Sequence, residues 1–187
     1  IFSGRGYYYR ARRANLMALL FLSLGSNIQR HLHIGAALDS LAENFGELII
    51  SSVYESESVG FEGDSFYNLA VGIRTDATIG TVSRLLKQIE DQNGRDRSAP
   101  RFGPRSLDID ILTVDDVAGE IEGVKLPRDE VLKNAFVLQP LAEVAGDNIH
   151  PVTGKTYSQH WQNYDRDKQK LWPVAFAWRG INLPPSA

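Results

Sequence analysis

The sequence of 187 residues contains no cysteine and a single methionine. Without thiols the chain can form neither a disulfide scaffold nor a thiolate metal site or nucleophile, which is compatible with a reducing compartment. It also lacks the Gly-x-x-x-x-Gly-Lys-Ser/Thr loop, so a P-loop nucleotide site is excluded. The four histidines show no spacing typical of a zinc site, and no apolar run is long enough to span a bilayer. We therefore expect a cytoplasmic protein with no membrane partner.

The composition is that of a globular protein, with 43% hydrophobic and 23% charged residues in 20.8 kDa. The formal net charge is −3, and residues 1–16 carry arginines but no acid, so the remainder is more acidic than the whole. An acidic chain is a poor nucleic-acid binder, and any anionic ligand must be held by locally clustered Arg and Lys. We expect a monomer with a single domain over residues 17–165 and a tail of unassigned role over residues 166–187.

Residues 1–16 precede the only methionine, Met17. We interpret them as a leader outside the fold, either non-native or disordered. The alternative is a signal peptide, because Arg12 and Arg13 precede an apolar run. Against that alternative, no small-x-small cleavage site follows, and the run leads directly into a Gly-Ser-Asn turn.

Hydrophobic periodicity predicts the element order β-α-β-β-α-β. The expected strands are residues 19–24, 48–56, 66–75 and 107–112, and the expected helices are residues 29–45 and 78–92. Ser26 or Asn27 is expected to cap the first helix, and Gly46 to end it. This order is typical of an α+β, ferredoxin-like fold, in which an antiparallel sheet carries both helices on one face.

The last third of the chain gives weaker signals. Residues 115–123 are expected to form a polar turn region, and a short helical stretch follows Pro127. Residues 136–144 are expected to add apolar packing and residues 157–164 a short helix. The C-terminal extension has no clear period, and no element is predicted there.

The stretch 101–112 carries the strongest chemical signal. Asp108 and Asp110 alternate with apolar residues at period two, so both carboxylates lie on one face of a strand, about 7 Å apart. Hard oxygen ligands at that spacing suit a pair of Mg²⁺ ions that hold one polyphosphate. The preceding loop is rich in arginines that could neutralise the same phosphates, namely Arg95, Arg97, Arg101 and Arg105. An isolated Asp-x-Asp on a surface strand is the simpler alternative, but the arginines and the apolar anchoring favour a polyphosphate site.

An aromatic pair and an amide accompany this stretch. Phe102 lies in the arginine-rich loop, while Phe66 and Asn68 belong to the third strand. Two rings and an amide can stack against and hydrogen-bond a flat heterocycle. The alternative interpretation of Phe66 is a core residue.

These residues resemble the 6-hydroxymethyl-7,8-dihydropterin pyrophosphokinase family. The resemblance runs over about residues 19–152 and is most specific at residues 22–27, 66–68, 90–95 and 101–110. It implies transfer of pyrophosphate from ATP to the hydroxymethyl group of 6-hydroxymethyl-7,8-dihydropterin, with release of AMP, in folate biosynthesis.

The resemblance also implies roles for individual residues. Two Mg²⁺ ions would be held by Asp108 and Asp110, and Arg95, Arg105 and Asp110 would be catalytic, with Asp110 a hypothetical base. ATP would be bound by Glu90, Arg95, Arg97, Arg105, Ile111, Lys125 and Arg128. The pterin would be bound by Gly25, Ser56, Val59, Phe66, Asn68, Phe102 and Phe136.

The chain departs from the family pattern after Pro127. Arg128, Asp129 and Asn134 stand where the family usually has a His, an aromatic or Pro, and an Arg. Arg128 can still meet a phosphate, and Lys125 can compensate for the missing arginine. These departures leave a second hypothesis open, a non-catalytic or substrate-shifted paralogue that binds nucleotide or pterin. RNA binding on the sheet face is a weaker third, because the strands lack the expected aromatic and basic pattern.

Overall fold

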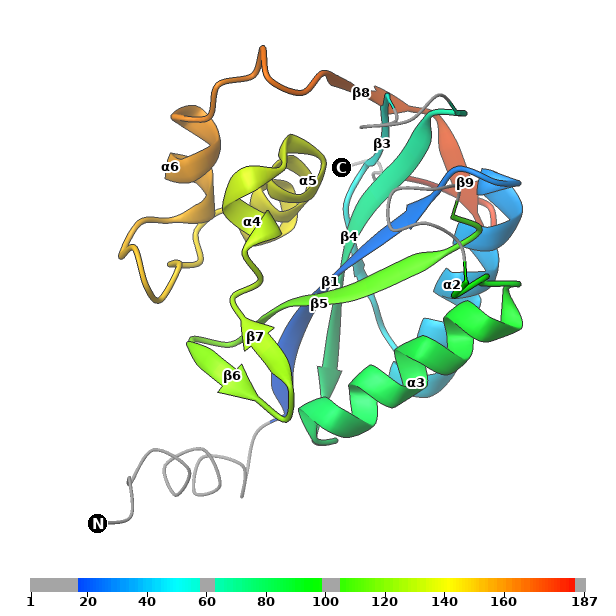
Figure 1. Cartoon of the computed structure of the whole chain (residues 1–187), viewed down its shortest axis with the longest axis horizontal. Coiled ribbons are helices and arrows are strands. Elements are labelled where there is room, and N and C mark those ends of the chain that lie inside the picture. The colour runs from blue at the N-terminus through cyan, green and yellow to red at the C-terminus, as the bar shows by residue number, and fades with distance from the viewer. Residues whose placement is uncertain (1–16, 58–62, 99–104, 184–187) are drawn as a thin grey trace.

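The computed structural model describes residues 17–57, 63–98 and 105–183 and is built on one antiparallel sheet (Figure 1). The strand order is β5-β1-β4-β3-β8, with the short β2 also paired to β4. The strands are β1 (Ala18–Ser26), β2 (Ile49–Ile50), β3 (Val53–Ser56), β4 (Phe66–Thr75), β5 (Asp108–Val114) and β8 (Leu171–Val174). The central order β5-β1-β4-β3 is the ferredoxin-like arrangement predicted from the sequence.

Helices α2 (Arg30–Phe45) and α3 (Ile79–Gln92) cover one face of this sheet. Every second residue of β1 enters the core with them, namely Leu20, Leu22 and Leu24. Helix α3 begins after Thr78, whose side chain accepts a hydrogen bond from the Thr81 N–H. The predicted α+β fold is therefore confirmed, with both predicted helices on one face.

The opposite face carries a smaller helical layer, in which α4 and α6 match the predicted short helices and α5 occupies the region from which only apolar packing was expected. It consists of α4 (Glu130–Lys133), α5 (Ala135–Ala145) and α6 (Tyr157–Gln162). Phe21 of β1 and Leu112 of β5 pack into a separate apolar cluster with these helices. This layer leaves the β5 end of the face open, and that opening contains the candidate site.

The strand expected over residues 48–56 is broken between β2 and β3. The Ser51 hydroxyl donates to the Ser52 carbonyl oxygen at 2.8 Å and accepts from the Ala70 N–H at 2.9 Å. The Ser52 N–H and hydroxyl both donate to the Glu143 carboxylate on α5, at 2.9 and 2.7 Å. Side-chain hydrogen bonds therefore supplement the ladder at this point, where the Ser51 N–H still donates to the Ala70 carbonyl oxygen at 3.0 Å, and a β-rich composition does not reveal this break.

The polar region expected over residues 115–123 is in part a hairpin of β6 (Gly119–Ile121) and β7 (Val124–Leu126). Its two turn residues, Glu122 and Gly123, have φ values of 49° and 81°. Positive φ at both positions is the geometry of a tight hairpin turn, and the Glu-Gly pair was not recognised as such a turn.

The expected cap of α2 was wrong. The helix begins after Gln29, which makes no side-chain cap, although Gly46 ends it as predicted. Asn27 does not cap the helix. Its side chain accepts a hydrogen bond from the Arg105 N–H at 2.7 Å and donates one to the Asp64 carbonyl oxygen at 3.2 Å. Asn27 therefore joins the chain segments on either side of the site.

Most of the C-terminal extension is folded. Beyond β8, strands β9 (Phe176–Trp178) and β10 (Ile181–Leu183) form a hairpin, and Phe176 and Leu183 enter the main core. The Trp178 indole N–H and the Arg179 guanidinium both donate to Asp39 on α2, at 3.0 and 2.8 Å. Within the described ranges, no helix combines the length and apolar character needed to cross a membrane.

Candidate active site

One row of residues crosses four strands and joins the two halves of the site. Asp108 of β5 pairs with Gly25 of β1, Gly25 pairs with Asn68 of β4, and Asn68 pairs with Tyr54 of β3. Directly paired residues of an antiparallel sheet project from the same face. Asp108 and Asn68 therefore lie on one face, separated by a residue without a side chain.

Strand β5 presents both carboxylates on that face because its apolar residues are buried on the other. Ile109 and Ile111 enter the core beneath α2 and α3. Asp108 and Asp110 remain accessible, with 40% and 34% of their side chains exposed. The period-two pattern thus brings the two acids to one side.

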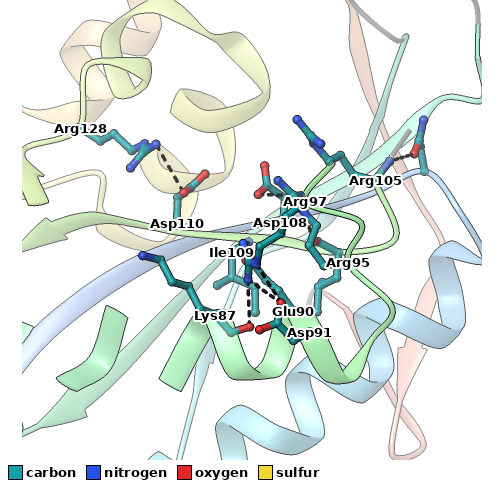
Figure 2. Close-up of polar contacts among 12 residues, drawn as sticks. Lys87, Glu90, Asp91, Arg95, Arg97, Arg105, Asp108, Ile109, Asp110 and Arg128 are labelled. Carbon is teal, nitrogen blue, oxygen red and sulfur yellow. Dashed lines mark hydrogen bonds and ion pairs between the residues drawn. The ribbon is translucent and has the colours of Figure 1, made fainter. Parts of the chain in front are cut away.

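Each carboxylate faces an arginine from a different element (Figure 2). Arg95 Nη1 lies 3.2 Å from Asp108 Oδ1, and Arg128 Nη2 lies 3.5 Å from Asp110 Oδ1. Burial raises the pKa of Asp110 to about 6, with repulsion by Asp108 as the second cause and attraction by Arg128 opposing both. A cation placed here would relieve that repulsion.

Glu90, near the end of α3, fixes β5 to the helix layer. Its carboxylate is 5% exposed and accepts a hydrogen bond from the Ile109 N–H at 2.8 Å, and its second oxygen lies 3.1 Å from Arg97 Nη2. Burial raises the pKa of Glu90, and the Ile109 hydrogen bond opposes the shift. Glu90 thereby determines the position of the residue between the two aspartates.

The arginines expected to bind phosphate are held differently from one another. Arg97 also bonds Asp91, at 2.9 Å, and the Lys87 carbonyl oxygen, at 3.2 Å. Arg105 is tied through its backbone to Asn27, as Figure 2 shows. Arg95 Nε is buried with no hydrogen-bond partner among the described residues. Such a donor could be satisfied by a ligand oxygen or by water.

A cavity of about 730 Å³ runs along the open edge of β5. Helix α3 forms one wall, with Lys87 and Glu90, and the β6–β7 hairpin and α4 form the other, with Lys125 and Arg128. Arg95, Arg97, both aspartates and Ile111 also line it. The cavity therefore collects all the residues expected to bind ATP except Arg105.

Two cationic residues of this cavity were missed in the sequence, Lys87 and Lys133. Lys87 precedes Glu90 by one helical turn and so shares its face, a signal that was available. Lys133 depends on the position of α4, which local sequence does not fix.

The described residues that are expected to bind the pterin are uncharged. Asn68 Nδ2 donates to Ser56 Oγ at 2.8 Å, and both residues are nearly buried. A side chain on Gly25 would lie 3.6 Å from Asn68 Oδ1, so its absence leaves room above the amide. Phe66 is half-buried at the start of β4. Val59 and Phe102, two further residues of this prediction, lie outside the described residues.

Phe136 is the second residue of α5 and is half-buried against the smaller apolar cluster. The family departures lie close to it in sequence. Arg128 bridges Asp110 and Glu130, and Asp129 pairs with Lys125 at 3.0 Å. Asn134 lies at the start of α5 and accepts a hydrogen bond from Gln169 at 3.1 Å. Only Arg128 of these departures reaches a predicted metal ligand.

Comparison with known proteins gives one consistent result. A model of the 7,8-dihydro-6-hydroxymethylpterin-pyrophosphokinase family matches residues 21–146. The 2-amino-4-hydroxy-6-hydroxymethyldihydropteridine pyrophosphokinase of Bacillus subtilis is 35% identical over 130 residues, which are 67% of this chain and 77% of that protein. The protein of the same name from Aquifex aeolicus is 34% identical over 141 residues, covering 74% of this chain and 88% of the other.

Solved structures agree on the fold. The chain matches an HPPK-DHPS structure in complex with substrates with a TM-score of 0.61 at 12% identity, and a Plasmodium falciparum HPPK-DHPS with a TM-score of 0.63 at 16% identity. The match covers 82% and 83% of this chain but only 44% and 43% of those longer chains. The sequence relatives, the matched family model and this fold together place the chain in the 7,8-dihydro-6-hydroxymethylpterin-pyrophosphokinase family.

Proposed function

We propose that this chain transfers the pyrophosphate group of ATP to the hydroxymethyl group of 6-hydroxymethyl-7,8-dihydropterin, with release of AMP, in folate biosynthesis. The observation that carries the proposal is the row Asp108–Gly25–Asn68. In this row, Asp108 of the charged cavity and the neutral amide of Asn68 project from the same face of the sheet. A pyrophosphokinase requires both, one for a polyphosphate and one for a heterocyclic alcohol.

The cavity along β5 would bind ATP. Arg95, Arg97, Arg105, Arg128 and Lys125 would contact the phosphates, while Glu90 and Ile111 would serve the nucleoside side. The guanidinium groups now paired with Asp108 and Asp110 are free to exchange those partners for phosphate oxygens, which arginine binds with strong bidentate geometry.

Asp108 and Asp110 would hold Mg²⁺, in keeping with the proposed two ions. Among the described residues no group of three or more His, Cys, Asp or Glu side chains could hold a metal alone. The two carboxylates of Asp108 and Asp110 fit Mg²⁺, which takes one or two carboxylates and completes its shell with phosphate oxygens and water. The bound ions would neutralise the charge of the polyphosphate.

Gly25, Ser56 and Asn68 would bind the pterin edge, with Phe66, Phe136, Val59 and Phe102 completing its surroundings. Asn68 carries both a donor and an acceptor, and its hydrogen bond to Ser56 fixes which of them faces the pocket. A rigid amide beside a glycine can distinguish a pterin from a ring with another hydrogen-bonding edge.

In the reaction the hydroxymethyl oxygen forms a bond to the β-phosphorus of ATP, and the bond from that phosphorus to the oxygen bridging the α- and β-phosphates breaks. AMP leaves with the bridging oxygen, and the hydroxyl proton must be lost. We propose Asp110 as its acceptor, because its carboxylate would lie beside the metal-bound hydroxymethyl group. Arg95 and Arg105 would stabilise the charge that develops on the transferred group.

The direct test is to incubate the protein with Mg-ATP and 6-hydroxymethyl-7,8-dihydropterin and to follow AMP. AMP formed in a 1:1 ratio with pyrophosphorylated pterin is the expected result. Pterin or nucleotide binding without AMP would instead indicate a non-catalytic paralogue. We further propose that the protein is cytoplasmic and monomeric. Light scattering in the presence of both ligands would test the monomeric state.

A further inference from the structure

A segment outside the family match connects the start of α5 with β3, two elements that carry residues assigned to the pterin. We define residues 163–174 as the C-terminal strap; the family model ends before it, at residue 146. The strap leaves α6, passes the junction of α4 and α5, and continues into β8 at the edge of the sheet (Figure 1).

The first attachment of the strap is at the start of α5. Gln169 Nε2 donates to Asn134 Oδ1 at 3.1 Å, and Gln169 Oε1 accepts the Ala135 N–H at 2.8 Å. Tyr164 adds a hydrogen bond from its hydroxyl to the Lys133 carbonyl oxygen at 2.8 Å. The strap therefore bonds three consecutive residues where α4 meets α5.

Gln169 performs the capping that the helix itself does not supply. Asn134 is the N-cap residue of α5 but makes no side-chain cap hydrogen bond. The first N–H groups of a helix have no partner within it and require an external acceptor. Gln169 provides that acceptor from a point 34 residues further along the chain. Phe136 is the next residue after Ala135, so the same contact steadies its backbone.

The second attachment of the strap is at β3. Leu171 pairs with Ser56, and Val174 pairs with Val53. Ser56 is the residue whose hydroxyl accepts the hydrogen bond from Asn68. The strap thus fastens the backbone of Ser56 and the backbone beside Phe136, with one residue between Gln169 and β8.

We propose that Gln169 is a positioning residue for pterin binding, acting through the first turn of α5 and the strand β8 that follows it. The inference rests on the proposed function, because Phe136 and Ser56 are assigned to the pterin there. It also explains why Asn134 is tolerated at a position where the family usually carries Arg. In this chain the short amide fastens the strap instead of reaching toward the nucleotide.

The test uses steady-state kinetics of the full chain with each substrate varied in turn. Gln169→Ala is expected to raise the KM for the pterin about five- to ten-fold, the size expected for losing one or two hydrogen bonds of ordinary net strength. The KM for ATP is expected to stay within about two-fold. Gln169→Glu can still accept the Ala135 N–H but cannot donate to Asn134, so its pterin KM should lie between those of wild type and Gln169→Ala. Gln162→Ala, an exposed glutamine on α6, is the matched control and should leave both KM values unchanged.

Pterin binding measured directly, by calorimetry in the presence of a non-hydrolysable ATP analogue, provides a readout independent of turnover. The expected result is that weakened pterin binding accompanies the raised KM. An unchanged pterin KM and affinity in Gln169→Ala would overturn the inference, as would equal losses for both substrates. If Gln169→Ala fails to fold, Gln169→Glu is judged by the same criteria. Wild-type protein that releases no AMP would instead contradict the proposed function itself.

Discussion

The proposed nucleotide side and the proposed pterin side of this site are built on different physical principles. Along β5, partly exposed carboxylates are paired with arginines at 3.2 and 3.5 Å. On β4 and β3, the nearly buried Asn68 and Ser56 share a neutral hydrogen bond of 2.8 Å. On the first side a ligand must replace existing ion pairs. On the second side a ligand would bind to an amide whose orientation is already fixed by its hydrogen bond to Ser56. We therefore expect the first side to govern charge neutralisation and rate, and the second side to determine which heterocycle is accepted.

The largest expected effect comes from removing one carboxylate on the nucleotide side. Asp110→Ala should lower kcat by at least about a thousand-fold, because a metal ligand and a proposed proton acceptor are lost together. Pterin binding should persist, since Asn68 and Ser56 are untouched. AMP release measures the rate, pterin titration measures binding, and circular dichroism checks that the fold is retained. Asp147→Ala, at an exposed position, is the control, and full activity in Asp110→Ala would refute the assignment.

On the pterin side, the corresponding change is Asn68→Ala. The KM for the pterin should rise roughly 10- to 100-fold, because the amide is lost and the Ser56 hydroxyl loses its partner. The KM for ATP should change little, and initial rates with each substrate varied will separate the two. Asn182→Ala, at an exposed position of β10, serves as control. Equal increases in both KM values would mean that the two sides are not separate.

A third prediction concerns the residue that holds β5 in place. Glu90→Ala should lower the free energy of unfolding by about 2 kcal/mol, because the buried Ile109 N–H loses its acceptor. Glu90→Gln keeps an acceptor oxygen and removes a buried charge, so its free energy of unfolding should fall much less than that of Glu90→Ala. Urea unfolding of both variants tests this. Equal losses would show that the charge of Glu90, and not its hydrogen bond, stabilises the strand.

The smallest expected effect is the pH dependence of stability at Asp110. Its pKa is raised from 3.8 to about 6 in the folded chain, so folding favours the protonated form and the ionised form destabilises the fold above about pH 6. Asp110→Asn should therefore be more stable than wild type at pH 7.5. The gain should be about 1 kcal/mol once solvent screening of this partly exposed group is included.

That difference should shrink as the pH falls through 6 and vanish below about 4, where both states of the wild type are protonated. Urea unfolding at several pH values in the absence of ligand measures it. A wild type more stable than Asp110→Asn at pH 7.5 would show that the Arg128 ion pair outweighs the cost of burial.

Local sequence patterns predicted the nucleotide side better than its surroundings. The alternation of Asp108 and Asp110 with apolar residues fixed their common face, because strand geometry leaves no other choice. The role of Asn27 was not predictable, since its partners Arg105 and Asp64 lie far along the chain. The break at Ser51 depends on similarly distant contacts.

The contacts of the C-terminal strap could not be predicted from the sequence either. Gln169 belongs to no periodic element, and its cap on α5 depends on how β8 docks against β3. Such contacts are set by tertiary packing, which propensity and periodicity do not encode. Elements with their own hydrophobic period were therefore predictable, while single polar residues that join distant segments were not.

The most direct test of the central claim is to follow the label of [β-³²P]ATP during one turnover with 6-hydroxymethyl-7,8-dihydropterin. The account predicts that the label moves to the pterin and that unlabelled AMP appears in equal amount. Labelled ADP together with an unlabelled pterin monophosphate would show transfer of a single phosphoryl group. That result would contradict pyrophosphate transfer at this site.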